Sequence, residues 1–156
     1  MHFKMSFHKI CASVFGIGFI GKGGGTIASI FYGIIWLLLP ATYTNSYWQL
    51  IITVFIIALG VWNSNVVDSH WGKDSSKVVI DEVAGMAITL LYLPHTIGSM
   101  IAGLILYRFF DILKPLGIKK LESWPKGWGV MADDVLAGLY ALIIMHIALQ
   151  LKLFLK

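Results

Sequence analysis

The chain has 156 residues, of which 58% are hydrophobic and only 13% are charged. Soluble domains carry about 25% charged residues, and disordered chains combine low hydrophobicity with high net charge, so both classes are excluded. The formal net charge of +4 comes from scattered basic residues rather than from a basic stripe, which argues against a nucleic-acid-binding protein. We therefore expect a single integral membrane domain over residues 1–156.

The first half of the chain contains a long uncharged stretch. No charged residue lies between Gly23 and Val67, and a polar, turn-forming patch at residues 40–46 divides the stretch. This pattern predicts two helices, at about residues 26–39 and 47–66. The second is long enough to cross a membrane, because a hydrocarbon core needs roughly 20 helical residues. The first is short unless the glycines before it also lie at membrane depth.

Two further uncharged stretches follow, Val83–Tyr107 and Val135–Leu151. Backbone groups in lipid must hydrogen-bond within the protein, and no stretch alternates with a period of two, so we expect an all-α, multi-pass membrane protein. Val135–Leu151 predicts a terminal helix. Val83–Tyr107 is interrupted at Pro94, and it predicts either one kinked span or two short helices folded into a hairpin.

The basic residues favour the hairpin. If Val83–Tyr107 enters the membrane and returns, ten of the twelve basic residues share one side, as the positive-inside rule favours for the cytoplasmic side. They are Lys4, Lys9, Lys22, Lys73, Lys77, Arg108, Lys114, Lys119, Lys120 and Lys126. Lys152 and Lys156 remain on the other side. We therefore expect about three full spans and a short helical hairpin.

Five of the eight acidic residues fall at the ends of the predicted apolar helices. They are Asp81, Glu82, Asp111, Asp133 and Asp134. Capping explains one acid at a helix start, but it explains neither adjacent pairs nor Asp111 at a helix end. The predicted topology puts all five on one membrane face. Mg²⁺ takes oxygen ligands and often also meets substrate phosphate, so the five carboxylates are candidate Mg²⁺ ligands.

Two basic residues flank Asp111 at three-residue spacing, Arg108 before it and Lys114 after it. This spacing predicts that the three side chains lie roughly along one helical face, where the two cations are candidate phosphate-binding groups. A ladder of interfacial ion pairs is the alternative. Gly25 and Thr26, in the glycine-rich entry to the first helix, form either a candidate anion cradle or merely a turn.

Four segments resemble signature blocks of the phosphatidylglycerophosphatase A family. They are Asp81-Glu-Val-Ala-Gly-Met86, Arg108-Phe-Phe-Asp-Ile-Leu-Lys-Pro115, Gly129-Val-Met-Ala-Asp-Asp-Val-Leu-Ala-Gly138 and Gly25-Thr-Ile-Ala-Ser29. The resemblance implies a Mg²⁺-dependent enzyme of the bacterial inner membrane, and the distribution of basic residues predicts that its active site faces the cytoplasm. Such an enzyme hydrolyses phosphatidylglycerophosphate to phosphatidylglycerol and phosphate. Ala28 and Gly117 stand where the family usually has Gly and commonly Pro, but neither departure removes a charged group.

The residues and the resemblance together assign a role to each candidate. We expect the catalytic residues to be Arg108, Lys114, Asp111 and Asp134, and the substrate-binding residues to be Gly25, Thr26, Arg108 and Lys114. The five carboxylates would hold one or more Mg²⁺ ions, and either water or an aspartate would attack the phosphorus. A small ion- or proton-coupled transporter and a structural subunit are the rival classes. Acids in mid-span would favour the transporter.

Overall fold

The computed structural model describes residues 2–44, 46–72, 75–125 and 127–154, and within these ranges the chain forms helices and loops without a β-strand. The elements are α1 (His2–Ala12), the 3₁₀ helix η1 (Ile17–Ile20), α2 (Gly24–Leu38), α3 (Ala41–Thr44), α4 (Tyr47–Trp71), α5 (Ile80–Thr89), α6 (Ile97–Leu113), α7 (Ile118–Leu121) and α8 (Gly127–Phe154). The predicted all-α class is confirmed.

Among the described residues, two helices are long and apolar enough to cross a bilayer: α4, and α8 over Gly127–Leu151. Only 28% of the most apolar window of each helix is buried inside the protein. The core helix of a soluble protein would be mostly buried, so these outward apolar faces fit contact with lipid. Helix α2 is apolar but has only 15 residues, which leaves it shorter than a full span.

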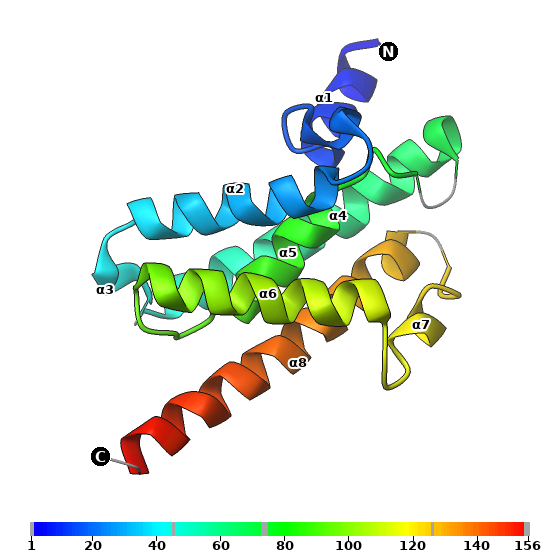
Figure 1. Cartoon of the computed structure of the whole chain (residues 1–156). Helices are drawn as coiled ribbons and strands as arrows, with labels where there is room; N and C mark the ends of the chain where they lie inside the picture. Colours follow the sequence, from blue (N-terminus) through cyan, green and yellow to red (C-terminus); the bar gives the residue numbers. More distant parts are fainter. Residues whose placement is uncertain (1, 45, 73–74, 126, 155–156) are drawn as a thin grey trace.

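Val83–Tyr107 forms the predicted hairpin. Helices α5 and α6 run in opposite directions and are joined by a turn at residues 90–96 (Figure 1). Helix α5 lies at the centre and packs against α2, α4, α6 and α8. It approaches α8 closely at two glycines, because a Cβ at Gly138 would overlap the backbone of Gly85. Small residues allow this close helix crossing.

Buried polar side chains fix the hairpin turn. Gln49 is fully buried; its Nε2 donates to the carbonyl of Leu90 over 2.9 Å, and its Oε1 accepts from the N–H of Tyr92 over 3.0 Å. His146 Nε2 lies 3.0 Å from the carbonyl oxygen of Leu91. Side chains of α4 and α8 therefore provide hydrogen-bond partners for these backbone groups of the turn. His146 is therefore a half-buried residue that hydrogen-bonds to the turn.

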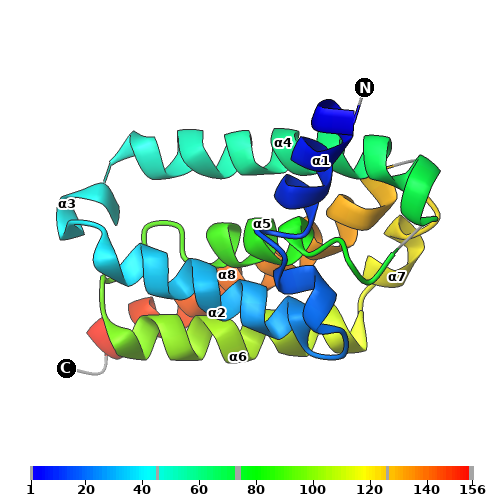
Figure 2. The same cartoon turned by 90° about the horizontal axis from the view of Figure 1, so that it is seen from above.

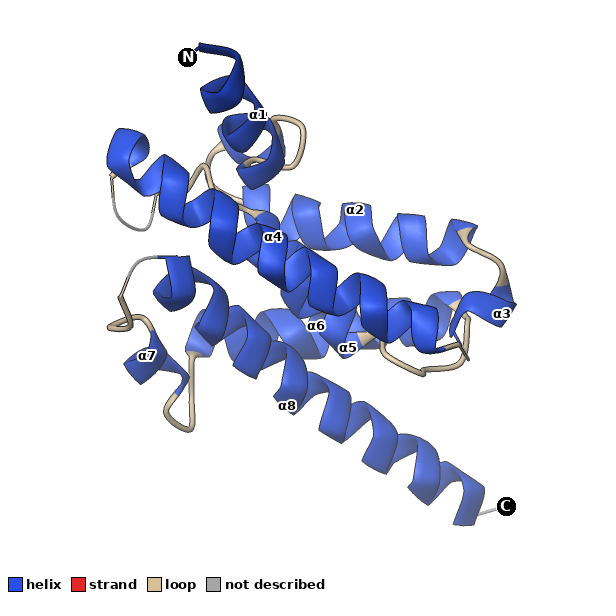
Figure 3. Ribbon diagram, turned by 180° about the vertical axis from the view of Figure 1, so that it is seen from behind, coloured by secondary structure: helices blue, strands red, loops and turns tan. Residues whose placement is uncertain are grey.

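The two ends of the bundle differ. Figures 1 and 2 show α7, the entry to α5 and the starts of α2 and α8 at one end, with α3, the 90–96 turn and the C-terminus at the other. Seen from behind, α4 and α8 lie in front of the α5–α6 hairpin (Figure 3). This arrangement agrees with the topology drawn from the basic residues. Lys73, Lys126 and Lys156 lie outside the described residues, and the structure does not describe the side chains of Lys4 and Lys152.

Candidate active site

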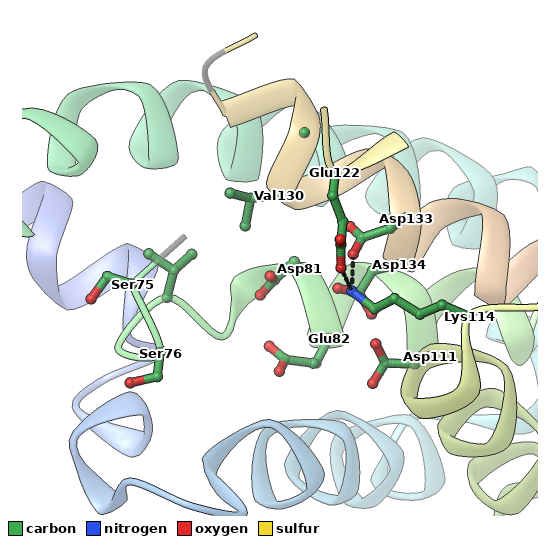
Figure 4. Close-up of a pocket in the computed structure, with 12 residues that line it drawn as sticks. Ser75, Ser76, Asp81, Glu82, Asp111, Lys114, Glu122, Val130, Asp133 and Asp134 are labelled. Atoms are coloured by element: carbon green, nitrogen blue, oxygen red, sulfur yellow. Dashed lines mark hydrogen bonds and ion pairs between the residues drawn. The ribbon is translucent and has the colours of Figure 1, made fainter. Parts of the chain in front are cut away.

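A polar cavity of about 310 Å³ opens at the end of the bundle where α5 begins and α6 ends. Its lining residues are Ser75, Ser76, Val78, Asp81, Glu82, Asp111, Lys114, Glu122, Gly129, Val130, Asp133 and Asp134 (Figure 4). The structure therefore brings together all five carboxylates singled out in the sequence and adds Glu122. Six carboxylates face one lysine in this lining, so the acidic pocket has a large excess of negative charge.

Asp81 and Glu82 lie in the first turn of α5, where the helix dipole favours negative charge. The N-cap residue is Val79, which makes no side-chain capping bond. Asp81 is only 7% exposed, and neither its Oδ1 nor Glu82 Oε2 has a hydrogen-bond partner within the described chain. Buried oxygens without donors are unfavourable unless a cation or water meets them. Both residues therefore present free ligand oxygens.

Asp111 lies in the last turn of α6, where the dipole disfavours a carboxylate. Arg108 compensates, because its Nη1 is 2.5 Å from Asp111 Oδ2. Arg108 does not itself line the acidic pocket, so it reaches the pocket through Asp111. Its buried Nε has no hydrogen-bond partner in the described part of the chain. The guanidinium thus keeps a free donor next to the cluster.

The structure corrects the predicted placement of Lys114 on one helical face with Arg108 and Asp111. Helix α6 ends at Leu113, and Lys114 is its C-cap in the left-handed conformation, with φ of 46°. Its side chain crosses to α8 and the α7 connection, where Nζ lies 2.5 Å from Asp133 Oδ2 and 2.6 Å from Glu122 Oε1. The turn after the helix, rather than helical spacing, directs this cation into the pocket.

The two carboxylates hold Lys114 in its charged form. Burial lowers the pKa of Lys114, but the hydrogen bonds to Asp133 and Glu122 outweigh burial and raise the pKa above its ordinary value. The same hydrogen bond from Lys114 lowers the pKa of Glu122. The contact between Lys114 and Glu122 is therefore a charged pair throughout the neutral range.

The predicted start of the last helix near Val135 is also wrong. Helix α8 begins at Gly127, about two turns earlier, so Asp133 and Asp134 do not cap it. The early start depends on α4, because the N–H of Gly127 donates to Asn65 Oδ1 over 2.7 Å. A Cβ at Gly127 would overlap the carbonyl of Val61, so glycine permits this contact. The adjacent aspartates then lie inside the helix and meet different partners.

Asp134 is held by Tyr107, which the sequence did not single out. The Tyr107 hydroxyl donates to Asp134 Oδ1, and Tyr107 is fully buried. The aromatic ring lies against Gly85, where a Cβ would overlap it. The glycine that follows the Asp81-Glu82 pair therefore makes room for the tyrosine. Glu122 was missed for another reason: it lies in a connecting segment and not at the end of a predicted apolar helix.

The predicted anion cradle at Gly25 and Thr26 lies beside the acidic pocket and does not line it. Both residues are in the first turn of α2, where backbone N–H groups lack intrahelical acceptors. A Cβ at Gly25 would overlap the carboxylate of Glu82. This glycine therefore lets the start of α2 approach Glu82 closely.

The ion-pair ladder accounts for only part of the cluster. The ion pairs in the described residues join Arg108 to Asp111, and Lys114 to Asp133 and Glu122. They do not include Asp81, Glu82 or Asp134. Within the same ranges, no three carboxylate, histidine or cysteine side chains are already arranged as a metal-binding group. The oxygen-only donor set and the unpaired oxygens of Asp81, Glu82 and Asp133 nevertheless suit a hard cation.

Comparisons with known proteins cover most of the chain. Residues 10–149 match the profile of the family described as phosphatidylglycerophosphatase A. A protein of Bacteroides thetaiotaomicron, provisionally named a phosphatidylinositol-3-phosphatase, is 41% identical over 86% of this chain and 88% of its own length. The phosphatidylglycerophosphatases A of Haemophilus influenzae and Escherichia coli are 35% and 31% identical, over 84% and 78% of this chain and 82% and 70% of their own lengths. No solved structure gives a significant match.

Proposed function

The chain belongs to the phosphatidylglycerophosphatase A family, and on that premise we propose that it hydrolyses the phosphate monoester of a membrane phospholipid, with phosphatidylglycerophosphate as the first candidate substrate. Enzymes of this family are phosphoric monoester hydrolases. The observation that carries the proposal is the acidic pocket, in which three helices and two loops bring six carboxylates and Lys114 together. A transporter is disfavoured, because these acids gather at one end of the bundle and not in mid-span.

We propose Mg²⁺ as the cofactor, held by Asp81, Glu82, Asp111, Asp133 and Asp134. These side chains offer only oxygen ligands, and the negative charge of the cluster would otherwise repel a phosphate. Bound Mg²⁺ supplies charge neutralisation at the phosphate oxygens and lowers the pKa of bound water.

The cationic side chains would neutralise the phosphate as its charge redistributes during transfer. Arg108 has a free Nε donor next to Asp111, and the Nζ of Lys114 already binds carboxylate oxygens in the acidic pocket. Arginine suits the forked geometry of phosphate oxygens, whereas lysine acts as a point charge. Gly25 and Thr26 would add backbone N–H groups at the rim.

We propose that water attacks phosphorus in line with the departing lipid oxygen. The new bond joins the water oxygen to phosphorus, the phosphorus–oxygen bond to the lipid breaks, and the proton that water gives up passes through a carboxylate to the departing lipid oxygen. A carboxylate must accept the proton from the attacking water. Asp134 is the best candidate, because Tyr107 engages its Oδ1 and leaves Oδ2 for this task. Direct attack by an aspartate oxygen is the alternative, and it would leave a phosphorylated protein that single-turnover assays can trap.

The setting we propose is the bacterial inner membrane, with the acidic pocket on the cytoplasmic side. The two bilayer-length helices support a membrane location. The basic residues Lys114, Lys119 and Lys120 belong to the same end of the bundle as the acidic pocket, which supports the orientation by the positive-inside rule.

Phosphatidylinositol phosphate is a second candidate substrate, favoured by the 41% identity to the Bacteroides thetaiotaomicron protein. Both lipids present a phosphate monoester on a hydroxylated headgroup, so the same acidic pocket could act on either. Phosphate release from each lipid, measured with the same purified enzyme in mixed micelles, ranks the two. The preferred substrate is the one with the higher kcat/KM.

The test of the proposed site uses Asp111→Asn and Asp134→Asn in purified protein. We expect both variants to lose activity by about a hundredfold or more, measured as phosphate release in detergent with Mg²⁺, because each removes a charged group from the reacting centre. Asp68→Asn is the matched control, since Asp68 does not line the acidic pocket. Wild-type turnover in both site variants would reject the site. Removal of divalent cations with a chelator should abolish activity, and added Mg²⁺ should restore it.

A further inference from the structure

A second cavity, of about 430 Å³, lies between α2 and α4. Helix α2 and its C-cap contribute Phe31, Ile35 and Leu39, and α4 contributes Ile52, Ile56 and Leu59. The four-residue and three-residue spacings place each set along one face of its helix. Both helices pack against α5, and Figure 2 shows α5 between them. We refer to this cavity as the α2–α4 groove.

The groove is almost purely apolar. Among its lining residues only Cys11, Tyr32 and Tyr43 carry polar side-chain atoms, and Tyr32 is 6% exposed. A peptide or a sugar in this groove would leave its polar groups without partners, which is costly away from water. A hydrocarbon chain needs no such partners, and burying its methylene groups is favourable.

The groove adjoins the acidic pocket through the first turn of α5. Ile80 and Val83 line the groove, whereas Asp81 and Glu82 line the acidic pocket. One helical turn thus has apolar side chains toward the groove and carboxylates toward the pocket. From this turn the groove extends along α4 for about 10 Å between Leu59 and Ile52 at 1.5 Å per residue. Its direction is that of a bilayer-length helix, as an acyl chain requires.

We propose that the α2–α4 groove binds one acyl chain of the lipid whose phosphate occupies the acidic pocket. This inference rests on the proposed function and adds the site that recognises the lipid tail. The acyl chain enters beside α5 and extends toward α3. The groove thereby holds the lipid at a fixed depth, and the phosphate stays in line with the carboxylates.

The first experiment labels the unaltered protein with a probe. The probe is the substrate lipid carrying a diazirine in the middle of one acyl chain, in mixed micelles, and irradiation is followed by peptide mass spectrometry. We expect the label on residues 31–39, in α2 and its C-cap, and on residues 52–59 of α4, and excess unlabelled substrate should reduce it. Label spread evenly over the exposed faces of α4 and α8, without competition, would overturn the proposal.

The second experiment narrows the groove with Ile56→Trp and compares two substrates that share a headgroup. One has long acyl chains and the other has two hexanoyl chains. We expect kcat/KM for the long-chain lipid to fall about tenfold, which is roughly the effect of excluding two buried methylene groups. For the short-chain lipid, kcat/KM should change less than about twofold. Val54→Trp is the matched control on the same helix, because Val54 is 56% exposed and lies outside the lining.

The outcomes separate this inference from the proposed function. If Ile56→Trp lowers kcat/KM equally for both substrates, the groove does not select the acyl chain. The inference then fails, while the phosphatase assignment stands. If the wild-type protein releases phosphate from neither lipid, the proposed function fails, and the labelling experiment still reports whether the groove binds a chain. A change from dimer to monomer in Ile56→Trp, measured by light scattering, would assign the groove to a second copy and overturn the inference.

Discussion

Tyr107 on α6 donates its hydroxyl hydrogen to Asp134 on α8, with both side chains buried. The hydrogen bond links two helices at the acidic pocket and engages one oxygen of a carboxylate that we place in the catalytic machinery. Gly85 on α5 supplies the space for the tyrosine ring. Three helices therefore determine the position of Asp134, and its neighbours in sequence do not.

We predict that Tyr107→Phe lowers kcat by about tenfold to a hundredfold, because hydrogen bonds to charged groups contribute about 1.5–3 kcal/mol. KM should change little, since Tyr107 does not line the acidic pocket. The ring remains, so packing against Gly85 is kept. Steady-state kinetics in detergent check the prediction, with Tyr140→Phe as the control, because Tyr140 donates only to the exposed carbonyl of Leu116. A rise in KM alone would contradict a positioning role.

Gly25→Ala should lower kcat/KM by about tenfold or more, because the new Cβ must displace the Glu82 carboxylate. The fold should persist, since the obstructed group is the end of a flexible side chain. Gly98→Ala is the matched control: the nearest atom to its Cβ is Thr96 Oγ1 at 3.9 Å. Phosphate release reports the effect of displacing the Glu82 carboxylate, and thermal unfolding reports whether the fold is damaged. Full activity in Gly25→Ala would show that Glu82 has room to move without consequence.

The ion pair between Lys114 and Glu122 should give stability a defined pH dependence. The lowered pKa of Glu122 means that its contribution is complete above the ordinary carboxyl pKa and is lost as the pH falls through the lowered value. The raised pKa of Lys114 maintains the pair at alkaline pH. We expect the Tm difference between wild type and Glu122→Gln to be constant from about pH 6 to pH 9 and to vanish in acid.

The corresponding difference in the free energy of unfolding should be small, about 1 kcal/mol or less, because the Glu122 side chain is 42% exposed. Thermal scans without added divalent cation measure it. The variant Glu122→Asp retains the charge and should keep the acid dependence. A Tm difference that persists unchanged into strong acid would show that the substitution acts through something other than charge.

Gln49→Leu should destabilise the protein by about 1–3 kcal/mol, because it removes two hydrogen bonds to the turn, one to the carbonyl of the buried Leu90 and one from the N–H of Tyr92. The hairpin turn lies at the opposite end of the bundle from the acidic pocket (Figure 1). Activity per folded molecule should therefore be retained. Unfolding in detergent, with the exposed Gln150→Leu as control, provides the measurement. Equal stability of the two variants would contradict the proposed anchoring of the turn.

Much of the fold follows from the sequence, because hydrophobicity and helix length are local properties. The uncharged stretches predicted α2, α4 and the terminal helix, and Pro94 with the lysine distribution predicted the α5–α6 hairpin. The same topology brought Asp81, Asp111 and Asp134 to one end. Capping explains neither adjacent acids at a helix start nor an acid at a helix end, so these residues were informative.

Only the tertiary structure decided how these groups meet. A left-handed turn after α6 directs Lys114 toward Glu122 and Asp133, and helical spacing predicts neither contact. The start of α8 at Gly127 depends on Asn65 in α4. The position of a helix end, and the partner of a buried hydroxyl such as that of Tyr107, depend on which distant backbone comes close enough to touch. That proximity is a property of packing between helices, and the pattern along any one of them does not contain it.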